Sequence, residues 1–557
     1  MAWQAALKIS SIKLELITDF EMYCFFEEGC RGGLCGGNVH HVKPEEPQEC
    51  LLALDANSLY AWCMTQPLPV NEFKWMEKEA WQTLFPLNSL ENWPNDYGEY
   101  GYAFDVDLTI PNHLHDYFAQ YPLAPLKQAI EKKDLSPYMK GQYHRSNPSM
   151  KSIRTEYKLL ATLRDKKHYK VHFRVLKFYL SKGCIVEHIH RVVQFRQKAW
   201  LKDYIDGNIA RRKQAQTTFE SDFYKLSNNS VFGKTQEQKR KRLNFHLTVS
   251  PKKMEYLIAQ PNYQGSVIFS QQLVGIHMSR KIVKLDQPIY SGFTILDLAK
   301  LLMYEFYYNA VMPCFSEEGD RVTMCYTDTD SLHLLLRSGD PKRTPLDKLT
   351  AISDQYIDGS NLPKSHPLYN THNKGVMGKF KEEMAGKKIT EMIILRPKMY
   401  AILTEDMAEK KKAKGVKKNI ISHLLRYANY YDIYERESKE DEEQISLIGK
   451  MTHFRSHKHR IYTERVQKKF LSCYENKRYW RSVNDSLPYG HYSIALETID
   501  EEEEDGPSIV PQRPPYRYPD MLNVKTRGQK RRHEDDNSND DNESVYECPL
   551  KQMTLNT

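Results

Sequence analysis

The 557-residue sequence is long enough for several domains, and its 40% content of hydrophobic residues suffices for a sizeable core. The net charge of +8 is unevenly spread: the segment from Thr498 onward carries 14 acidic and 8 basic residues, a net −6, so the part before it carries +14, which suits a polyanionic partner. No apolar stretch approaches the ~20 residues of a membrane span, and Met1–Asp19 lacks the layout of a secretory signal, so we expect an intracellular protein without a membrane contact.

The predicted elements begin with a lead-in, residues 1–48, which ends in the glycine-rich segment GCRGGLCGG. Next, ECLLALDANSLYAW (49–62) predicts a strand that enters a helix, and EYGYAFDVDLTIP (99–111) predicts a strand that ends at its proline. From Leu159 to Lys202, apolar and basic residues mix at mostly helical spacing, so we expect helices there. The later expectations are a helix over 218–235 with Ser221 as its N-cap, a long apolar core helix over 288–312, a hairpin over 321–337, lysine-rich text over 374–418 and a compact mixed region over 453–495.

The last part of the chain is too charged and too rich in proline to fold alone, so we expect it to be disordered. Its basic cluster at 530–532 is a weak signal for nuclear import. Near the other end, Cys30, Cys35, His40 and His41 are potential zinc ligands, but their spacing is not that of a zinc finger or ribbon. Reduced cysteines are the interpretation we favour over a zinc site.

The stretch YTDTDSLHLLL (326–336) places Asp328 and Asp330 one residue apart between apolar runs. They are either a solvated turn or a pair of metal ligands at the tip of a hairpin, where a hard cation takes oxygen ligands. A similar pair, Asp105 and Asp107, lies in an alternating strand pattern. For that second pair we prefer the simple interpretation, two carboxylates on the wet face of a strand.

Asp55 follows the apolar run Leu51–Leu54, so it lies at the exit of a predicted buried strand. An unpaired charge is costly there, whereas a metal ligand is suitable. Taken alone, a helix cap is the simpler role for Asp55. If a helix begins just after it, the backbone amides around Ser58 and Leu59 can face a triphosphate, with Tyr60 beneath the sugar.

The segment KLSNNSVFG places Lys225, Asn229 and Phe232 at i, i+4 and i+7, on one face of a helix. The lysine offers a point charge for phosphate and the ring can stack on a base pair. A solvated helix face is the alternative, but the residues 229–233, NSVFG, are poor choices for the exposed surface of a helix.

In ILRPKMYAIL (394–403), Lys398 and Tyr400 lie two apart on a predicted strand, hence on one face, where they could grip a phosphate backbone. The basic glycine turn KKKAKGVKKN (410–419) could contact a duplex independently of its sequence. A solvated lysine-rich loop explains that turn equally well.

The four motifs D-x-x-S-L-Y, K-x-x-x-N-S-x-F-G, Y-x-D-T-D-S and K-x-Y, in this order, resemble those of family B DNA polymerases over most of residues 5–497. Further stretches, among them GCRGGLCGG, YPLAPL and FRSHKHRIYTERVQKKFLSCYENKRYW, resemble the protein-primed branch, in particular the polymerases of Polinton/Maverick mobile elements and related viruses.

The resemblance implies a mixed α+β right-hand polymerase, whose palm is an antiparallel sheet with helices, with helical fingers and a small thumb. The boundaries we expect are a lead-in with the glycine-rich loop (1–48), a first palm part (49–110), an insertion of the protein-primed type with helices (111–185), fingers (186–245), a second insertion or fingers–palm connector (246–287), a second palm part (288–420), a thumb-like region (421–497) and the disordered tail (498–557).

The resemblance also implies the function of a template-directed DNA polymerase that adds deoxynucleotides to a primer 3′-OH by a two-metal mechanism. Its cofactor would be Mg²⁺, two ions, with Mn²⁺ as a substitute. Its partners would be primer–template DNA, deoxynucleoside triphosphates and, for protein-primed initiation, a terminal protein. Tyr60 would obstruct a ribose 2′-OH. The implied residues are Asp55, Asp328 and Asp330 for catalysis; Asp55, Asp330 and the carbonyl of Ala56 for metal; Ser58, Leu59, Tyr60, Arg212, Lys225, Asn229, Phe232 and Gly233 for the nucleotide; and Arg31, Gly32, Gly33, Thr329, Ser331, Lys398, Tyr400, Lys414 and Gly415 for DNA.

The sequence departs from the family pattern at several positions. Phe232 stands where many relatives carry tyrosine, Ser221 where some carry lysine, and the tripeptide YEN (474–476) replaces a more acidic version. Family members usually have a 3′–5′ exonuclease domain ahead of the glycine-rich loop, which here follows only about 30 residues. Asp19-Phe20-Glu21 matches the D-x-E pattern of an exonuclease motif. It lies in a sequence typical of a helix, so we interpret it as a chance match.

We therefore expect a polymerase without proofreading, which replicates a mobile element or virus-derived DNA. The alternative is a truncated, inactive remnant that binds DNA but adds no nucleotide. A metal-dependent nuclease is a third possibility, but it leaves the Lys225–Gly233 helix and Tyr60 without a role.

Overall fold

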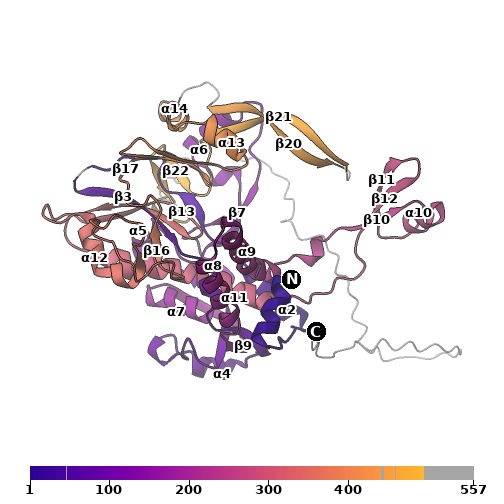
Figure 1. Ribbon diagram of the computed structural model, residues 1–557. Helices are drawn as coiled ribbons and strands as arrows, with labels where there is room; N and C mark the ends of the chain where they lie inside the picture. Colours follow the sequence, from indigo (N-terminus) through magenta and orange to yellow (C-terminus); the bar gives the residue numbers. More distant parts are fainter. Residues whose placement is uncertain (46, 441–444, 458–459, 495–557) are drawn as a thin grey trace, which may run out of the picture. The chain divides into compact units, whose positions relative to one another are not determined.

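The computed structural model describes residues 1–45, 47–440, 445–457 and 460–494, all within one unit, Met1–Ile494 (Figure 1). Helices and strands are interspersed along this unit, which confirms the predicted α+β class. Among the helices of these residues, none has the length and apolar character needed to cross a membrane. The expectations for the tail, 498–557, and its basic cluster at 530–532 lie outside the described residues.

A six-stranded sheet joins segments that lie far apart in the sequence. The apolar run after Glu49 forms strand β3 (Glu49–Ala56), and the predicted hairpin is present beside it. Every neighbouring pair in this sheet is antiparallel except β15–β16. In order across the sheet the strands are β1 (Cys35–Gly37), β13 (Arg321–Asp328), β14 (Ser331–Arg337), β3, β16 (Phe380–Glu382) and β15 (Ile357–Asp358).

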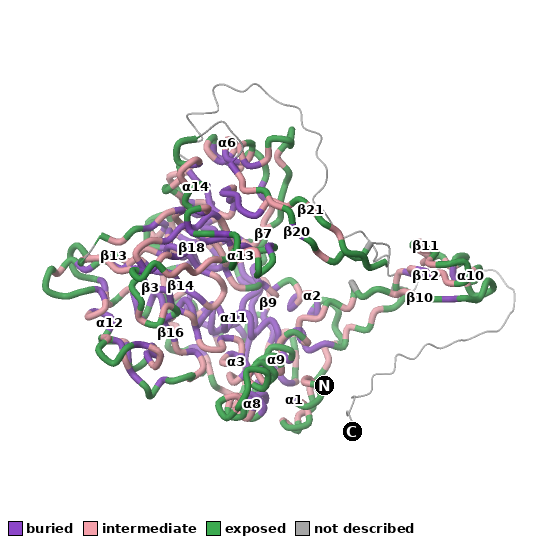
Figure 2. The backbone as a smooth tube through the Cα atoms, turned by 45° about the horizontal axis from the view of Figure 1, so that its top comes forward, coloured by how far each residue is buried: buried purple, intermediate pink, exposed green. Residues whose placement is uncertain are grey.

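Both faces of this sheet are buried, which explains why β3 is a continuous apolar run instead of an alternating one. Leu52 and Leu54 belong to the main core together with helix α11 (Ile289–Glu305), the predicted core helix. Leu51 and Ala53 pack instead with residues of a second sheet. Figure 2 shows this burial in purple around α11, β3 and β14. The second sheet has the order β19 (Glu409–Ala413), β18 (Met399–Thr404), β17 (Ile389–Arg396) and β2 (His41–Val42).

The expectation of helices over most of 159–202 is wrong. Only α7 (Phe173–Ser181) is helical there. The sequence IVEHIHRVVQFRQK, in which apolar and polar residues mix, forms a 14-residue strand, β9 (Ile185–Lys198). Toward its end, buried Val193, Phe195 and Gln197 alternate with the more exposed Gln194, Arg196 and Lys198, a period of two instead of 3.6, while Val192 packs into a different core cluster on the opposite face. A third sheet results, in the order β4 (Leu68–Trp75), β9, β5 (Tyr100–Thr109) and β8 (Lys166–His172). The fingers boundary expected at 186 therefore falls inside β9.

The interpretation of Asp105 and Asp107 as carboxylates on a wet strand face is also wrong. Asp105 is only 1% exposed. Its carboxylate lies 3.4 Å from Nζ of Lys170 on β8, and Asp107 is bonded by Nε2 of His190 on β9 at 2.9 Å. Nζ of Lys167, also on β8, lies 3.1 Å from Asp107, so side chains from the two neighbouring strands contact both acids and the pair is structural.

Two helices that carry predicted nucleotide contacts pack side by side, α8 (Lys202–Gln214) and α9 (Thr218–Thr235). Buried Asn208 on α8 donates to Oδ1 of buried Asn228 on α9 at 2.8 Å and joins them. The expected N-cap, Ser221, is wrong. Thr217 caps the helix because it forms a capping box with Glu220, in which each side chain bonds the other's backbone N–H.

The compact region expected over 453–495 is mostly a long hairpin that starts earlier, at Ser446. The other elements are α1 (Ala2–Ser10), α2 (Phe20–Gly29), α3 (Leu59–Met64), α4 (Lys78–Leu84), α5 (His115–Phe118), β6 (Leu126–Ile130), α6 (Pro137–Ser146), β7 (Glu156–Leu160), β10 (Asn244–Thr248), α10 (Pro251–Ile258), β11 (Tyr263–Ser270), β12 (Leu273–Met278), α12 (Pro345–Tyr356), α13 (Lys418–His423), α14 (Tyr427–Ser438), β20 (Ser446–His457), β21 (Arg460–Ser472), β22 (Tyr479–Ser482) and β23 (Asp485–Leu487).

Candidate active site

Acidic residues from distant parts of the chain meet at one end of the six-stranded sheet. Asp55 lies near the end of β3, and its partner in the register of β14 is Ser331. The backbone N–H of Ala56 donates to the carbonyl oxygen of Asp330 at 2.7 Å. Ala56 and Asp330, 274 positions apart in the sequence, are thus direct neighbours, as expected if Asp55 and Asp330 serve one site.

The turn that carries Asp328 and Asp330 is tight and closely held. Thr329 has a φ of +68°, in the left-handed region, and its N–H donates to the carbonyl oxygen of Leu34 at 2.7 Å. A Cβ atom on Gly33 would lie 2.7 Å from Cγ2 of Thr329. The glycine-rich loop therefore needs a glycine at 33 because the turn with Asp328 and Asp330 passes so close to it.

Electrostatics mark this end of the sheet as a site for positive charge. The pKa of Asp55 is raised to about 7, first by burial and then by the charges of Asp330 and Glu383, against the opposing effect of Lys410 and Lys225. The pKa of Asp330 is also raised, by burial first. Carboxylates that hinder one another's ionisation in this way are relieved when a cation binds between them.

Glu383 is the residue that sequence analysis missed. Its N–H donates to the carbonyl oxygen of Ala53 at 2.9 Å, and its Oε2 is 2.8 Å from Nζ of Lys410. The adjacent Glu382 has a different role, because it accepts from the backbone N–H groups after it. Only the pairing of β16 with β3 places Glu383 beside Asp55, so no local signal distinguishes the two glutamates.

The donor set suits a hard divalent cation. The oxygens of Asp55, Asp330 and Glu383, with the carbonyl oxygen of Ala56, are of the type that Mg²⁺ prefers. The raised pKa of Asp55 reflects burial first and the neighbouring negative charges next. In the part of the chain that the structure describes, no three His, Cys, Asp or Glu side chains are already arranged around a metal position. The fit is one of chemistry and charge.

Lys398 and Tyr400 both lie at the site, but they are not on one face of a strand as expected. Lys398 sits in the turn before β18 with a φ of +63°, and its Nζ is paired with Asp328 at 2.5 Å. Tyr400 is buried against Tyr326, whose hydroxyl accepts from the N–H of Lys398 at 2.8 Å. The carbonyl of Lys398 in turn accepts from the N–H of Lys414 at 3.0 Å, which brings the basic glycine turn next to this pair.

Helix α9 presents its predicted face to the carboxylates. The ring of Phe232 stacks on Tyr60 with centroids 4.4 Å apart and an angle of 12°. The charge of Lys225 acts on the pKa of Asp55. Burial and then Cys63, Asp330 and Asp328 raise the pKa of Tyr60 to about 12, so the phenol is also within range of the acids.

The remaining predicted nucleotide contacts surround this face. Ser58 has a φ of +48° and directly precedes α3, so a helix does begin after Asp55 as the sequence predicts. The side chain of Leu59 is in the core. Asn229 and Gly233 are exposed on α9. Arg212, at the end of α8, is bonded through Nε to Oγ of Ser221 at 3.3 Å.

The expected contact of Arg31 with DNA is corrected by the structure. Arg31 is 5% exposed, its Nη1 donates to the carbonyl oxygen of Lys170 at 2.7 Å, and its guanidinium lies 3.8 Å from the centroid of Tyr169. The arginine therefore anchors the loop to β8. Gly32 has open space where a Cβ would be, and Gly415 has a φ of +85°.

The four residues considered as zinc ligands have separate partners. Cys30 donates to the carbonyl oxygen of Phe26, Cys35 contacts the hydroxyl of Tyr326 at 3.5 Å, His40 bonds the carbonyl oxygen of Ile394, and His41 pairs with Glu391. Each has a structural role where it stands.

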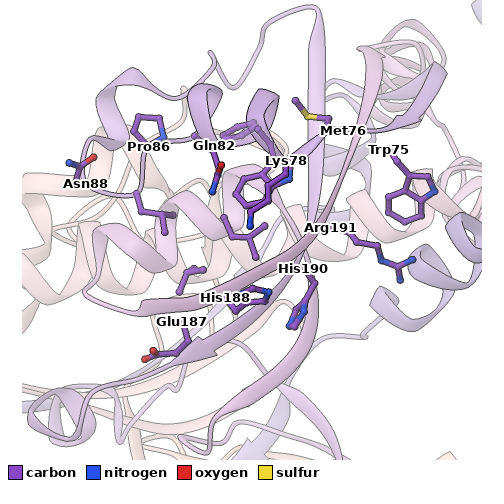
Figure 3. A pocket seen from close by; sticks show the side chains of 15 residues that line it. Trp75, Met76, Lys78, Gln82, Pro86, Asn88, Glu187, His188, His190 and Arg191 are labelled. Carbon is purple, nitrogen blue, oxygen red and sulfur yellow. The ribbon is translucent and has the colours of Figure 1, made fainter.

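A cavity of about 670 Å³ lies between α4 and β9 (Figure 3). Trp81 and Phe85 line it from the helix side, and Val186, His188 and Arg191 from the strand. It contains none of the residues predicted for catalysis, nucleotide or DNA.

Comparison with known proteins gives a family match and several similar solved structures. A family model described as DNA polymerase type B, organellar and viral, matches residues 13–309, which include Asp55, Lys225 and Phe232. Among solved structures, phi29 DNA polymerase complexed with primer-template DNA and incoming nucleotide has a TM-score of 0.48 and 13% identity, covering 85% of this chain and 66% of that chain. The orthorhombic crystal form of phi29 DNA polymerase has a TM-score of 0.49 and 13% identity, with coverage of 85% and 68%. The chain thus spans about two thirds of the length of these structures. No curated protein matches it.

Proposed function

The chain belongs to the type B DNA polymerases of the organellar and viral group, and from this premise we propose that it is a template-directed DNA polymerase that adds deoxynucleotides to a primer 3′-OH. The observation that carries the proposal is the meeting of Asp55, Asp330 and Glu383, with the pKa of Asp55 raised to about 7. Such charge accumulation suits phosphoryl transfer, in which catalysis is mostly positioning and electrostatic stabilisation.

In this reaction the primer 3′-oxygen forms a bond to the α-phosphorus, the bond to the bridging oxygen breaks, and pyrophosphate leaves. Asp55, Asp330 and the carbonyl of Ala56 would hold two Mg²⁺ ions, with Mn²⁺ as a substitute, and Glu383 would balance their charge. When bound, the ions lower the pKa of the 3′-OH and neutralise the triphosphate and the leaving group.

The other residues bind and orient the substrates. Lys225 supplies positive charge for the triphosphate, and Arg212, bonded to Ser221 one helical turn before Lys225, adds to it. Tyr60 is held by its stacking on Phe232, 4.4 Å away, and so keeps a fixed place beneath the sugar, where it excludes a ribose 2′-OH. Asn229 is exposed on the same helix face for the nascent base pair.

The contacts proposed for DNA lie around Lys398. Its ammonium is paired with Asp328 at 2.5 Å, so it can serve the primer end only by exchanging that carboxylate for a phosphate. Lys414 and Gly415 adjoin it through the bond from the N–H of Lys414 to the carbonyl of Lys398. Together they would hold the primer strand without reading its sequence.

We also propose that this chain extends primers without proofreading. Asp19, the first residue of the D-x-E match, caps α2 by accepting from the N–H groups of Glu21 and Met22, and its second oxygen accepts from Trp75. It is thus engaged in structure. Replication of a mobile element or virus-derived DNA, priming by a terminal protein and a nuclear location stay proposals that rest on the resemblance and on the tail.

Extension of a labelled primer by the purified chain, with Mg²⁺ and deoxynucleoside triphosphates, tests the proposal. Asp330→Ala should abolish extension while primer–template binding persists. Asp354→Asn, at a side chain 94% exposed on α12, is the matched control and should extend normally. If the wild type binds primer–template but adds no nucleotide, the chain is the inactive DNA-binding remnant instead.

A further inference from the structure

Strand β1 supports the turn that carries Asp328, and it is an edge strand of the six-stranded sheet as described. Cys35 is the register partner of Asp328. The carbonyl of Leu34 accepts from Thr329, and the N–H of Asn38 donates to the carbonyl of Cys325 at 3.0 Å. The position of the turn therefore depends on how firmly this short strand is held from its other side.

That other side is held by residues that follow the long hairpin, in the segment Tyr474–Leu487. Nζ of Lys477 donates to the carbonyl oxygen of Cys35 at 2.7 Å. Oγ of Ser486 donates to the carbonyl oxygen of Asn38 at 2.7 Å. Side chains of this segment thus supply hydrogen-bond donors to two carbonyl groups at the edge of the sheet. Without them, these carbonyl groups would have to be solvated.

A third contact continues the same support beyond the strand. The indole of Trp480 stacks on the ring of His40, with centroids 4.0 Å apart, and both side chains are 1% exposed. Nδ1 of His40 is bonded to the carbonyl of Ile394 at 2.6 Å. The segment therefore contacts this part of the chain at three positions, Cys35, Asn38 and His40.

The segment itself is rigidly placed. Glu475, Asn476 and Arg478, on either side of Lys477, are 4%, 2% and 5% exposed, which is unusual for such polar residues. Oε1 of Glu475 accepts from the N–H of Lys477 at 2.6 Å, and Nη1 of Arg478 donates to the carbonyl of Ala119 at 3.1 Å. Burial of these groups is tolerated because they are bonded, and their bonds fix the backbone from which Lys477 extends.

We propose that Lys477 is a positioning residue of the active site, which holds Cys35 and thereby keeps Asp328 and its turn in the geometry for nucleotide addition. The inference rests on the proposed polymerase function and deepens it. Lys477 acts through the backbone of Cys35 and touches no reacting atom. Small displacements of a catalytic carboxylate are enough to slow such a reaction strongly.

The test uses the full chain with Lys477→Met, which keeps the length of the side chain but removes its charge and its hydrogen bond. Lys127→Met is the matched control, because Nζ of Lys127 also donates to a cysteine carbonyl, that of Cys30 at 3.0 Å, away from the register of Asp328. Single-turnover extension should be about tenfold slower for Lys477→Met. The Mg²⁺ concentration for half-maximal rate should rise severalfold, while the Kd for primer–template stays within twofold. Lys477→Arg should recover most of the rate, and Lys127→Met should behave as wild type.

Three results would overturn the inference. One is an unchanged rate and Mg²⁺ dependence for Lys477→Met. Another is a loss of primer–template affinity with a shallower salt dependence, which would make Lys477 a phosphate ligand. If Lys477→Met does not fold, Ser486→Ala carries the test, because Ser486 holds the same strand through the carbonyl of Asn38. It should change the rate and the Mg²⁺ dependence in the same direction, but by less than expected for Lys477→Met. The third result is a rate and Mg²⁺ dependence of Ser486→Ala equal to those of wild type.

The two proposals fail in different ways. If the wild type adds no nucleotide, the polymerase function fails. Calorimetric titration with Mn²⁺ then still examines the positioning role, because weaker binding by Lys477→Met supports it and equal binding contradicts it.

Discussion

Replacing Asp55 by asparagine tests the accumulation of negative charge at the site. The pKa of Asp55 is raised from 3.8 to about 7 by burial first and by Asp330 and Glu383 next. A folded-state pKa above the unfolded value means that the contribution to stability is fully present below pH about 4. It is lost as the pH rises through the folded pKa, so the ionised carboxylate destabilises the metal-free protein at pH 8.

The magnitude follows from the shift. About three pKa units at 1.36 kcal/mol each give roughly 4 kcal/mol as an upper limit, and partial solvent access at the mouth of the site reduces this to about 2 kcal/mol. The asparagine side chain cannot ionise, so Asp55→Asn should be more stable than wild type by about 2 kcal/mol at pH 8. The gain should shrink progressively toward pH 4.5.

Urea denaturation in the presence of a chelator, at several pH values between 4.5 and 8, measures this difference. Asp354→Asn, at an exposed position, should show no pH-dependent gain. Added Mg²⁺ should stabilise wild type and not Asp55→Asn, since only the wild type keeps the full set of oxygen ligands. A variant that is no more stable than wild type at pH 8, or whose gain is the same at every pH, would refute the reasoning.

Other substitutions test single contacts. Glu383→Gln removes one of the charges that raise the pKa of Asp55, so the pH-dependent loss of stability should move to lower pH in the same denaturation series; an unmoved profile contradicts the contact. Tyr60→Ala removes the ring that stacks on Phe232 and should raise ribonucleotide incorporation at least tenfold relative to deoxynucleotides, and unchanged selectivity in primer extension would show that Tyr60 does not face the sugar. Arg31→Ala should lower the free energy of unfolding by about 2–4 kcal/mol through the lost bond to Lys170 and the lost contact with Tyr169, while the Kd for DNA, measured by fluorescence anisotropy, should not change.

The sequence was most informative where local pattern and chemistry agree. Asp55 follows an apolar run that is a buried strand, and Asp328 and Asp330 occupy a turn between two apolar strands, so their approach was predictable from the motifs. The helix with Lys225 and Phe232 was predictable for the same reason, because its face recurs at helical spacing. These residues form the part of the site that the structure brings together as expected.

The errors arise where distant segments decide the outcome. Arg31 looks exposed in a glycine-rich loop, but Tyr169 and Lys170, more than a hundred residues away, bury it. Glu383 lies in a lysine-rich segment of the sequence, and only the pairing of β16 with β3 brings it close to Asp55. The local pattern around Asp105 indicates a solvent-exposed strand face, because the basic residue that pairs with it lies on another strand.

The central claim is that Asp55 and Asp330 hold the cations that drive nucleotide addition, with Glu383 as a neighbouring negative charge. Single-nucleotide extension of a primer by wild type and Asp330→Ala, side by side with Mg²⁺, tests it most directly. The account predicts addition by wild type and a loss of at least a thousandfold in Asp330→Ala with unchanged primer–template affinity. Addition by Asp330→Ala at a rate near that of wild type would contradict it.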